Sequence, residues 1–313
     1  MIIFFESGRG GNQIFQYCAL KRLSGGGALF IIGVKSLVAL FDGVELAGAK
    51  RWESVVFRLC YRLGKERIAR IAYKLHLITV ITEQETPSGP RIAVHRGLFK
   101  KIIYCDTAYF QSERFIKPSI VRTLQVKRRF VEQATNIFAT FPPDRSACFF
   151  VHVRRGDYVY WPEKSKPAVL PCKWYRDQMD VIRHEFRNPF FVVVSDDWPY
   201  VDEMFADCQD VFISRESEGV DFAIMTLCDG GVLSASSFSW WAAYCARLNR
   251  NAKYFVAPRL WAGHRQGQWY PAGMKSDWIQ YVDVDEGDAG APCVEPTGGA
   301  IKRCGYPSVQ LRI

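Results

Sequence analysis

Short apolar runs alternate with helical patterns through the second half of the chain. Between the runs, apolar positions recur every three or four residues, as at Tyr175, Met179 and Ile182. That spacing is typical of an amphipathic helix, and a second such pattern covers 238–248. Alternating strands and helices favour βαβ units and a parallel sheet. The predicted strands are 148–153, 190–195, 211–213, 231–234 and 254–257.

The first half has a similar but less regular pattern. It predicts a strand at 2–5, a helix at 12–23 and a strand around 28–34, followed by a basic helical region and a mixed segment at 92–110. Pro142 and Pro143 then interrupt the pattern. We therefore predict an α/β protein with domains at 1–142 and 143–286 and an irregular tail at 287–313.

Polar residues follow the strand predicted at 148–153. Arg154, Arg155, Gly156 and Asp157 come directly after it, and His152 lies within it. Ligands of open parallel sheets bind outside the carboxyl ends of the strands. Because a guanidinium group donates two parallel hydrogen bonds to a phosphate or carboxylate, the two arginines favour an anionic ligand.

A glycine-rich turn follows the first strand. The segment Gly8-Arg9-Gly10-Gly11-Asn12-Gln13 leads into the helix at 12–23. Glycines let a ligand approach the backbone closely, and a helix N-terminus attracts negative charge. The segment matches neither the dinucleotide-binding nor the P-loop fingerprint, so a tight turn without a ligand is an equal alternative.

Polar groups also follow other predicted strands. Ser195 and Asp196 end the strand at 190–195, Asp221 lies near the start of a helix, and Ser236 and Ser237 precede the helix at 238–248. Hydroxyl groups at a helix start form an anion site together with the backbone N–H groups. The same residue types are common N-caps, so capping is the alternative role for Asp221, Ser236 and Ser237.

Composition limits the partners. The 313 residues carry a formal net charge of +9, without a known nucleic-acid module or a basic face interleaved with aromatic residues, so we expect no nucleic-acid partner. The basic amphipathic stretch 51–76 either contacts an anionic membrane or packs inward as ordinary helices. Ten scattered cysteines without a C-x-x-C pair predict a reducing compartment and no metal site. With no apparent leader or spanning segment, we expect a cytoplasmic protein, with peripheral membrane contact through 51–76 as a further possibility.

Taken in order, these motifs resemble the bacterial type of α-1,2-fucosyltransferase in glycosyltransferase family 11. The resemblance implies a GT-B architecture, in which two Rossmann-like domains face each other across a cleft, and a GDP-fucose donor. It places Arg154 on the pyrophosphate, His152 against the nucleotide and Asp221 on the guanine. The phosphates would be lined by Ser236, Ser237 and Phe238. Gly11 and Asn12 would reach the donor from the other domain, and the full donor set would include Arg155, Ser195 and Asp196.

The resemblance further implies inverting transfer without a metal to a galactose-containing glycan in polysaccharide biosynthesis. Arg154, Asp157 and Asn12 form the predicted catalytic set, with Asp157 as first candidate for the general base and Glu6 as second. The alternative role of Asp157 is a loop cap or an ion-pair partner of Arg155. A fucosyltransferase of α-1,6 or O-linked type and a non-catalytic nucleotide- or glycan-binding protein are alternative functions.

Three positions depart from the family pattern. Gly10 stands where leucine is usual, Gly230 where histidine is frequent, and Ala235 where asparagine is common. The last two substitutions predict fewer polar groups near the phosphate site.

Overall fold

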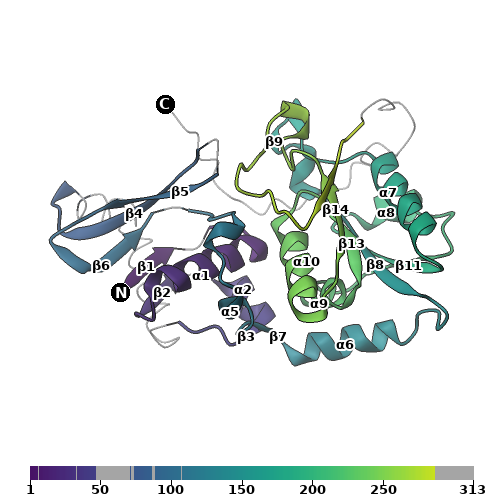
Figure 1. The fold of residues 1–313 in the computed structure, drawn as a ribbon, viewed down its shortest axis with the longest axis horizontal. Helices are drawn as coiled ribbons and strands as arrows, with labels where there is room; N and C mark the ends of the chain where they lie inside the picture. Colours follow the sequence, from purple (N-terminus) through teal and green to yellow (C-terminus); the bar gives the residue numbers. More distant parts are fainter. Residues whose placement is uncertain are drawn as a thin grey trace.

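The protein consists of two α/β units that lie side by side (Figure 1). The computed structural model describes residues 1–5, 7–32, 34–46, 71, 74–86, 89–106 and 108–285. The predictions for Glu6, for most of 51–76 and for 287–313 lie outside these residues. The first unit runs from β1 to β7 and the second from α6 to β15.

The second unit is built on a fully parallel six-stranded sheet in the order β12-β11-β8-β13-β14-β15. Numbered by sequence within the unit, this order is 3-2-1-4-5-6, that of the doubly wound dinucleotide-binding fold. Strand order reverses between β8 and β13, which is where such a sheet opens a crevice for ligands. The strands are β8 (Ala147–Val153), β11 (Pro189–Ser195), β12 (Val211–Ile213), β13 (Gly230–Val232), β14 (Tyr254–Pro258) and β15 (Gln280–Val282).

All five strands predicted for this unit are therefore confirmed, with ends that differ by no more than two residues. Apolar side chains cover both faces of the central strands, because every residue from Phe149 to Val151 and from Phe191 to Val193 is nearly or fully buried. The helices are α6 (Arg128–Phe138), α7 (Cys172–Glu185), α8 (Trp198–Met204), α9 (Glu218–Leu227) and α10 (Ser237–Arg250), and short elements are η2 (Gly156–Val159), β9 (Pro162–Glu163), β10 (Lys166–Pro167) and η3 (His264–Gln266).

The first unit contains a five-stranded sheet in the order β2-β1-β6-β4-β5, parallel except for β5. The strand predicted at 2–5 and the helix predicted at 12–23 are confirmed. The strand β4 had no counterpart in the sequence prediction. The sheet strands are β1 (Ile2–Phe5), β2 (Leu29–Ile32), β4 (Ile78–Gln84), β5 (Arg91–His95) and β6 (Phe99–Cys105), and the other elements are α1 (Gly10–Ser24), α2 (Lys35–Leu40), β3 (Phe41–Asp42), η1 (Glu113–Phe115), α5 (Pro118–Val121) and β7 (Gln125–Val126).

The two units pack through α1 and α10 at the centre of the molecule (Figure 1). The Phe15 ring of α1 lies 4.9 Å from Trp240 and 4.8 Å from Trp241 of α10, centroid to centroid. All three side chains are buried, so this contact is part of the hydrophobic core. The predicted GT-B architecture of two α/β units is thus confirmed.

Helix α6 precedes the Pro142-Pro143 break but packs on the second unit. It runs along α9 (Figure 1), and the Phe130 ring fills the space beside Gly219, where an added Cβ would lie 2.5 Å from the ring. Its apolar side therefore belongs to the core of the second unit, although sequence places it on the other side of the break.

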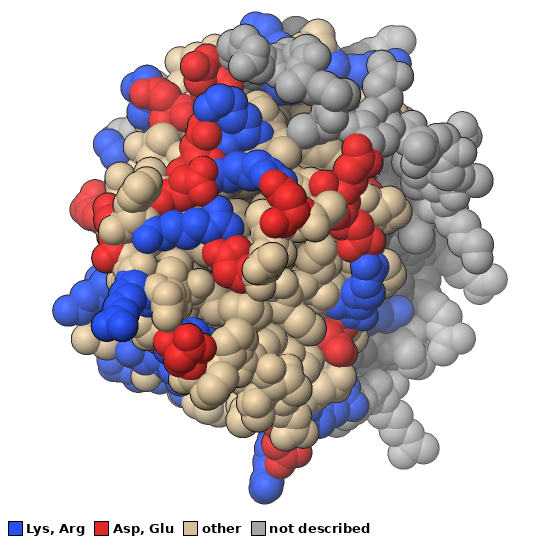
Figure 2. All heavy atoms as spheres, turned by 90° about the vertical axis from the view of Figure 1, so that its right-hand side faces the viewer, with Lys and Arg blue, Asp and Glu red and all other residues tan. Residues whose placement is uncertain are grey.

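The face at the right of Figure 1 mixes both signs of charge. Figure 2 shows Lys and Arg interspersed there with Asp and Glu. On and around α7 and α8, arginines face carboxylates in ion pairs such as Arg183 with Asp210 and Arg215 with Asp202. Within the described ranges, no helix is long and apolar enough to cross a membrane.

Candidate functional site

The candidate site lies at the strand-order reversal of the second unit, around Ser234. This hydroxyl follows β13, accepts a hydrogen bond from the Arg154 N–H at 2.8 Å and donates to the His152 carbonyl at 2.5 Å. It also exchanges a hydrogen bond with the Tyr175 hydroxyl at 2.7 Å. Buried polar groups are mostly hydrogen-bonded, and these bonds join the loop after β13 to the end of β8.

Two carboxylates hold the Arg154 side chain. Nη1 lies 2.6 Å from Asp196 Oδ2, and Nη2 bonds to Asp157 Oδ1. Arg9 of the first unit also approaches Asp157, at 3.9 Å. Only 16% of the Arg154 side chain is exposed, and these two carboxylates set its direction.

The Arg155 side chain has different partners from Arg154. Its Nε donates to Asp197 at 3.0 Å, and its guanidinium lies 3.6 Å from the centroid of the Tyr200 ring. The ion-pair partner of Asp157 is therefore Arg154, not Arg155. Asp196 Oδ1 accepts from the Arg155 backbone N–H at 2.8 Å, and Ser195 Oγ accepts from the Asp197 N–H at 3.0 Å, so both of these residues shape the turn after β11.

His152 is buried beside this cluster with one ring nitrogen unsatisfied. Its Nδ1 has no hydrogen-bond partner, although only 5% of the residue is exposed. Burial, with the nearby Arg154 charge, lowers the pKa of His152 to about 3, so the ring is neutral at physiological pH. An unpaired buried polar atom costs about 1–3 kcal/mol.

The N-termini of α10 and α1 meet next to these residues. Ser236 caps α10 by accepting from the Phe238 N–H at 3.3 Å, and the Ser237 hydroxyl donates to Asn12 Oδ1 at 3.0 Å. An added Cβ on Gly11 would lie only 2.6 Å from the Ser237 carbonyl carbon and 2.7 Å from the Phe238 nitrogen. Neither helix has an acidic residue in its first turn, so two positive helix ends converge on one place.

The close approach at Gly11 predicts a stability effect. We expect Gly11→Ala to lower the free energy of unfolding by about 1–3 kcal/mol, since its methyl group would push against backbone atoms that have no room to move. Denaturant unfolding would measure it. Gly10→Ala is the matched control, because its Cβ would meet the movable Glu218 carboxylate at 3.0 Å; equal losses in both variants would contradict the prediction.

Asp221 lies one turn inside α9, where Ser217 occupies the N-cap position. The alternative capping role of Asp221 is therefore wrong. Its Oδ1 accepts from the Ser214 hydroxyl at 2.5 Å, and 8% of the residue is exposed. Burial, aided by Glu216 and Glu218, raises the pKa of Asp221 to about 7. The neighbouring Phe222 contacts Phe238, and Phe238 lies 6.0 Å from His152, so Asp221 belongs to the same side of the sheet.

The structure thus brings together the predicted residues from both units. It adds Arg9, Gln111 and Ser234, of which Arg9 and Ser234 stood in predicted motifs and Gln111 did not; Gln111 Nε2 donates to Asn12 Oδ1 at 2.7 Å. Nothing in the local pattern around Gln111 distinguishes it from a surface residue, so sequence reasoning could not find it.

The expectation about Gly230 is wrong. This residue begins β13, so it lies at the amino end of the strand, away from the predicted phosphate site. An added Cβ would lie 2.3 Å from the Tyr254 carbonyl oxygen, which leaves no room for a side chain. Ala235 does lie at the site, where its carbonyl accepts from the Tyr158 hydroxyl at 2.7 Å.

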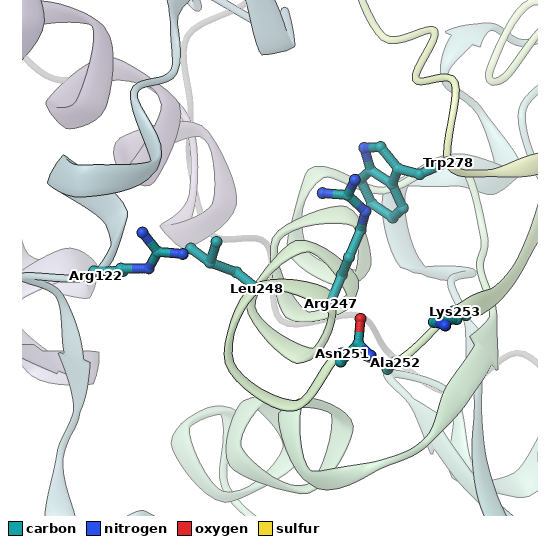
Figure 3. Close-up of a pocket in the computed structure, with 7 residues that line it drawn as sticks. All are labelled: Arg122, Arg247, Leu248, Asn251, Ala252, Lys253 and Trp278. Carbon is teal, nitrogen blue, oxygen red and sulfur yellow. The ribbon is translucent and has the colours of Figure 1, made fainter.

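A hollow lies near the C-terminal end of α10, away from the candidate site. It has a volume of about 430 Å³ and is lined by Arg122, Arg247, Leu248, Asn251, Ala252, Lys253 and Trp278. Arg247 lies against the Trp278 ring, whereas Arg122 and Lys253 lie on opposite sides (Figure 3). The three cations do not point at one spot, so they do not converge on a single anion. In the part of the chain that the structure describes, no three His, Cys, Asp or Glu side chains group as metal ligands.

Comparison with known proteins gives a family match. The model of Glycosyl transferase family 11 matches residues 96–281. The chain is 26% identical to the O-antigen biosynthesis glycosyltransferase WbnK of Escherichia coli over 298 residues, which cover 84% of this chain and 95% of that protein. It is 35% identical to an alpha-1,2-colitosyltransferase of Escherichia coli over 58% of this chain and 72% of that protein.

Two further matches are to a human enzyme and to a solved structure. The human galactoside alpha-(1,2)-fucosyltransferase 1 is 27% identical over 77% of this chain and 64% of that protein. The crystal structure of fucosyltransferase NodZ from Bradyrhizobium overlaps 77% of this chain and 91% of that chain, with a TM-score of 0.47 and 13% identity.

Proposed function

Because this chain belongs to glycosyltransferase family 11, we propose that it transfers L-fucose from GDP-β-L-fucose to the 2-hydroxyl of a β-galactoside, with inversion at the anomeric carbon. The names of its curated relatives support an α-1,2 linkage, a galactoside acceptor and a place in O-antigen or related polysaccharide synthesis.

One observation carries this proposal. The N-termini of α1 and α10 meet at Gly11 and Ser237, beside Arg154 and the unsatisfied Nδ1 of His152. Backbone N–H groups, two helix dipoles and a fixed guanidinium all favour negative charge at one place. A nucleoside diphosphate sugar supplies that charge in its pyrophosphate group.

The transition state of this reaction needs the most charge stabilisation at the leaving group. The acceptor hydroxyl oxygen forms a bond to the anomeric carbon and gives up its proton to a general base or to solvent, while the bond to the phosphate oxygen breaks and GDP leaves with the electron pair. Negative charge therefore develops on the phosphate in the transition state, and donors fixed before the reaction stabilise it without reorganisation. Arg154, held by Asp157 and Asp196, meets that requirement.

These contacts also suggest a role for Asp157. Its Oδ1 already accepts from Arg154 Nη2, so this oxygen is engaged in holding the guanidinium. We propose that Asp157 positions Arg154 instead of acting as the general base.

The remaining predicted residues would recognise the nucleotide. His152 is neutral, and its ring lies 6.0 Å from Phe238 at the start of α10, where it would pack beside the nucleotide. The Asp221 carboxylate can accept the adjacent N1–H and N2–H groups of guanine, which adenine lacks. Asn12 would orient groups across the junction, because it already links Ser237 to Gln111.

Incubation with GDP-fucose and a β-galactoside, followed by measurement of GDP release and the new linkage, tests the proposal directly. We expect release that depends on acceptor and an α-1,2 product. A well-folded protein that binds GDP but transfers to no galactoside would instead identify a non-catalytic binding protein.

We also expect transfer to proceed without a metal ion. Arg154 and the N-termini of α1 and α10 would stabilise the negative charge on the leaving GDP. Activity should therefore be unchanged in excess EDTA. The check is an initial rate measured with and without EDTA. Loss of activity that Mn²⁺ restores would overturn the metal-free mechanism.

The likeness to an alpha-1,2-colitosyltransferase favours a second candidate donor, GDP-colitose, within the same reaction. Colitose lacks the 3-hydroxyl of fucose. A direct comparison of kcat/KM for the two donors would decide between them.

A further inference from the structure

Three adjacent parallel strands of the first unit end at one edge of its sheet. Ser7 follows β1, Tyr109 follows β6, and Glu85 directly follows β4. The Tyr109 hydroxyl lies 3.2 Å from Ser7 Oγ, and the Tyr109 N–H donates to Glu83 at 2.6 Å. These bonds fix Tyr109 at the carboxyl end of the sheet, the edge where an α/β unit binds its ligand.

The second unit contributes aromatic side chains opposite this edge. Tyr270 lies 5.6 Å from the Trp161 ring, which lies 4.9 Å from Tyr158, and the Arg154 guanidinium is 5.5 Å from the Tyr158 ring. An unbroken row of aromatic rings therefore leads from the candidate phosphate site to Tyr270.

The segments that carry these residues are in contact. An added Cβ on Gly273 would lie 2.6 Å from Pro90, which follows Glu85 in the loop after β4, and 2.4 Å from the Gln111 carbonyl oxygen. The three segments that carry Tyr270, Tyr109 and Glu85 thus lie against one another. Burial and the neighbouring Glu85 and Tyr109 raise the pKa of Tyr270, in agreement with this placement.

Two of these aromatic rings remain open to solvent. Tyr109 is 41% exposed and Tyr270 is 40% exposed, and Glu85 lies at the surface beside them. Tyrosine offers an apolar ring face with a polar tip, which suits a ligand that alternates C–H faces with hydroxyl groups. A carboxylate accepts hydrogen bonds from such hydroxyls. A sugar has this combination of surfaces.

We propose that Tyr109, Tyr270 and Glu85 form the subsite for the acceptor sugar, with a galactoside stacked on the tyrosines and hydrogen-bonded to Glu85. The identity of the sugar rests on the proposed function. The position agrees with that function, because Ser7 and Gln111 on either side of Tyr109 lie along the same edge as Gly11 and Asn12.

Binding of methyl β-galactoside, measured by ligand-observed NMR titration in saturating GDP, tests this subsite without requiring transfer. We expect Tyr109→Ala and Tyr270→Ala each to weaken galactoside binding about tenfold or more, and Glu85→Gln to weaken it by several fold. Calorimetric titration should give an unchanged GDP affinity in all three. Trp198→Ala is the matched control, since Trp198 is 42% exposed on α8 of the second unit.

The outcomes separate the two proposals. If the wild-type protein binds no galactoside, or if the tyrosine variants bind it as tightly as wild type, the subsite is wrong. Selective loss in those variants supports the subsite even if no sugar is transferred, in which case only the proposed reaction fails. Tyr109→Phe and Tyr270→Phe retain the ring, so they should retain most of the binding and show that any loss is not due to misfolding.

Discussion

Arg154→Lys is expected to lower kcat for sugar transfer by about 10²–10³-fold, the range found when one preorganised donor to a developing oxyanion is removed. The guanidinium reaches Asp196 and Asp157 at once through its two terminal nitrogens. An ammonium group is a single point charge and cannot span both carboxylates while it contacts the phosphate. Steady-state kinetics with saturating GDP-fucose and acceptor would measure the loss.

The matched control for this variant is Arg215→Lys. Arg215 is also paired with a carboxylate, its Nη2 donating to both oxygens of Asp202 at 2.6 and 2.7 Å, but it lies at the surface beside α8. It should leave kcat near the wild-type value. Near-normal turnover in folded Arg154→Lys protein would remove Arg154 from the pyrophosphate site.

Asp221→Asn is expected to weaken GDP binding by about 10- to 100-fold. Hydrogen bonds to charged groups contribute about 1.5–3 kcal/mol, and the substitution replaces one acceptor oxygen with an amino group that faces the guanine donors. The remaining Oδ1 can still accept from Ser214, so the fold should survive. Calorimetric titration with GDP would measure the affinity, and an unchanged value would assign guanine recognition to other groups.

The same carboxyl group predicts a pH dependence. In the free protein the pKa of Asp221 is raised to about 7, so the group is largely protonated below that pH and ionised above it. GDP needs the ionised form, so wild-type affinity should rise as the pH increases through 7. The Asn variant should lack this component, which separates it from titration of the phosphate itself.

The free energy of unfolding should change with pH in the opposite direction to the GDP affinity. A raised folded-state pKa means that the folded protein holds the proton more tightly than the unfolded chain does. The contribution of Asp221 to stability is therefore present near pH 4 and is lost as the pH rises toward and through 7. Denaturant unfolding of wild type and Asp221→Asn across that range would test this, since the variant should not lose that component.

The sequence by itself determined five of the six sheet strands of the second unit. Strands such as β8 and β11 are buried on both faces, so their residues form continuous apolar runs with abrupt polar ends, and both features are local. For the same reason, the local sequence pattern was enough to identify Arg154, Ser236 and Ser237 as candidate site residues. The strand β4 escaped prediction because Ile78–Gln84 mixes apolar with polar residues in a less regular way.

Only the tertiary structure decided how the candidates are used. Asp157 and Asp196 are 39 positions apart, yet both hold Arg154, because β8 and β11 are neighbours and end at the same edge. The contact of Gly11 with Ser237 depends on how the two units pack, which no local pattern specifies. The same is true of Tyr109 and Tyr270. A strand end shows that a residue is available for chemistry, but the order of strands in the sheet and the packing of units decide which residues meet.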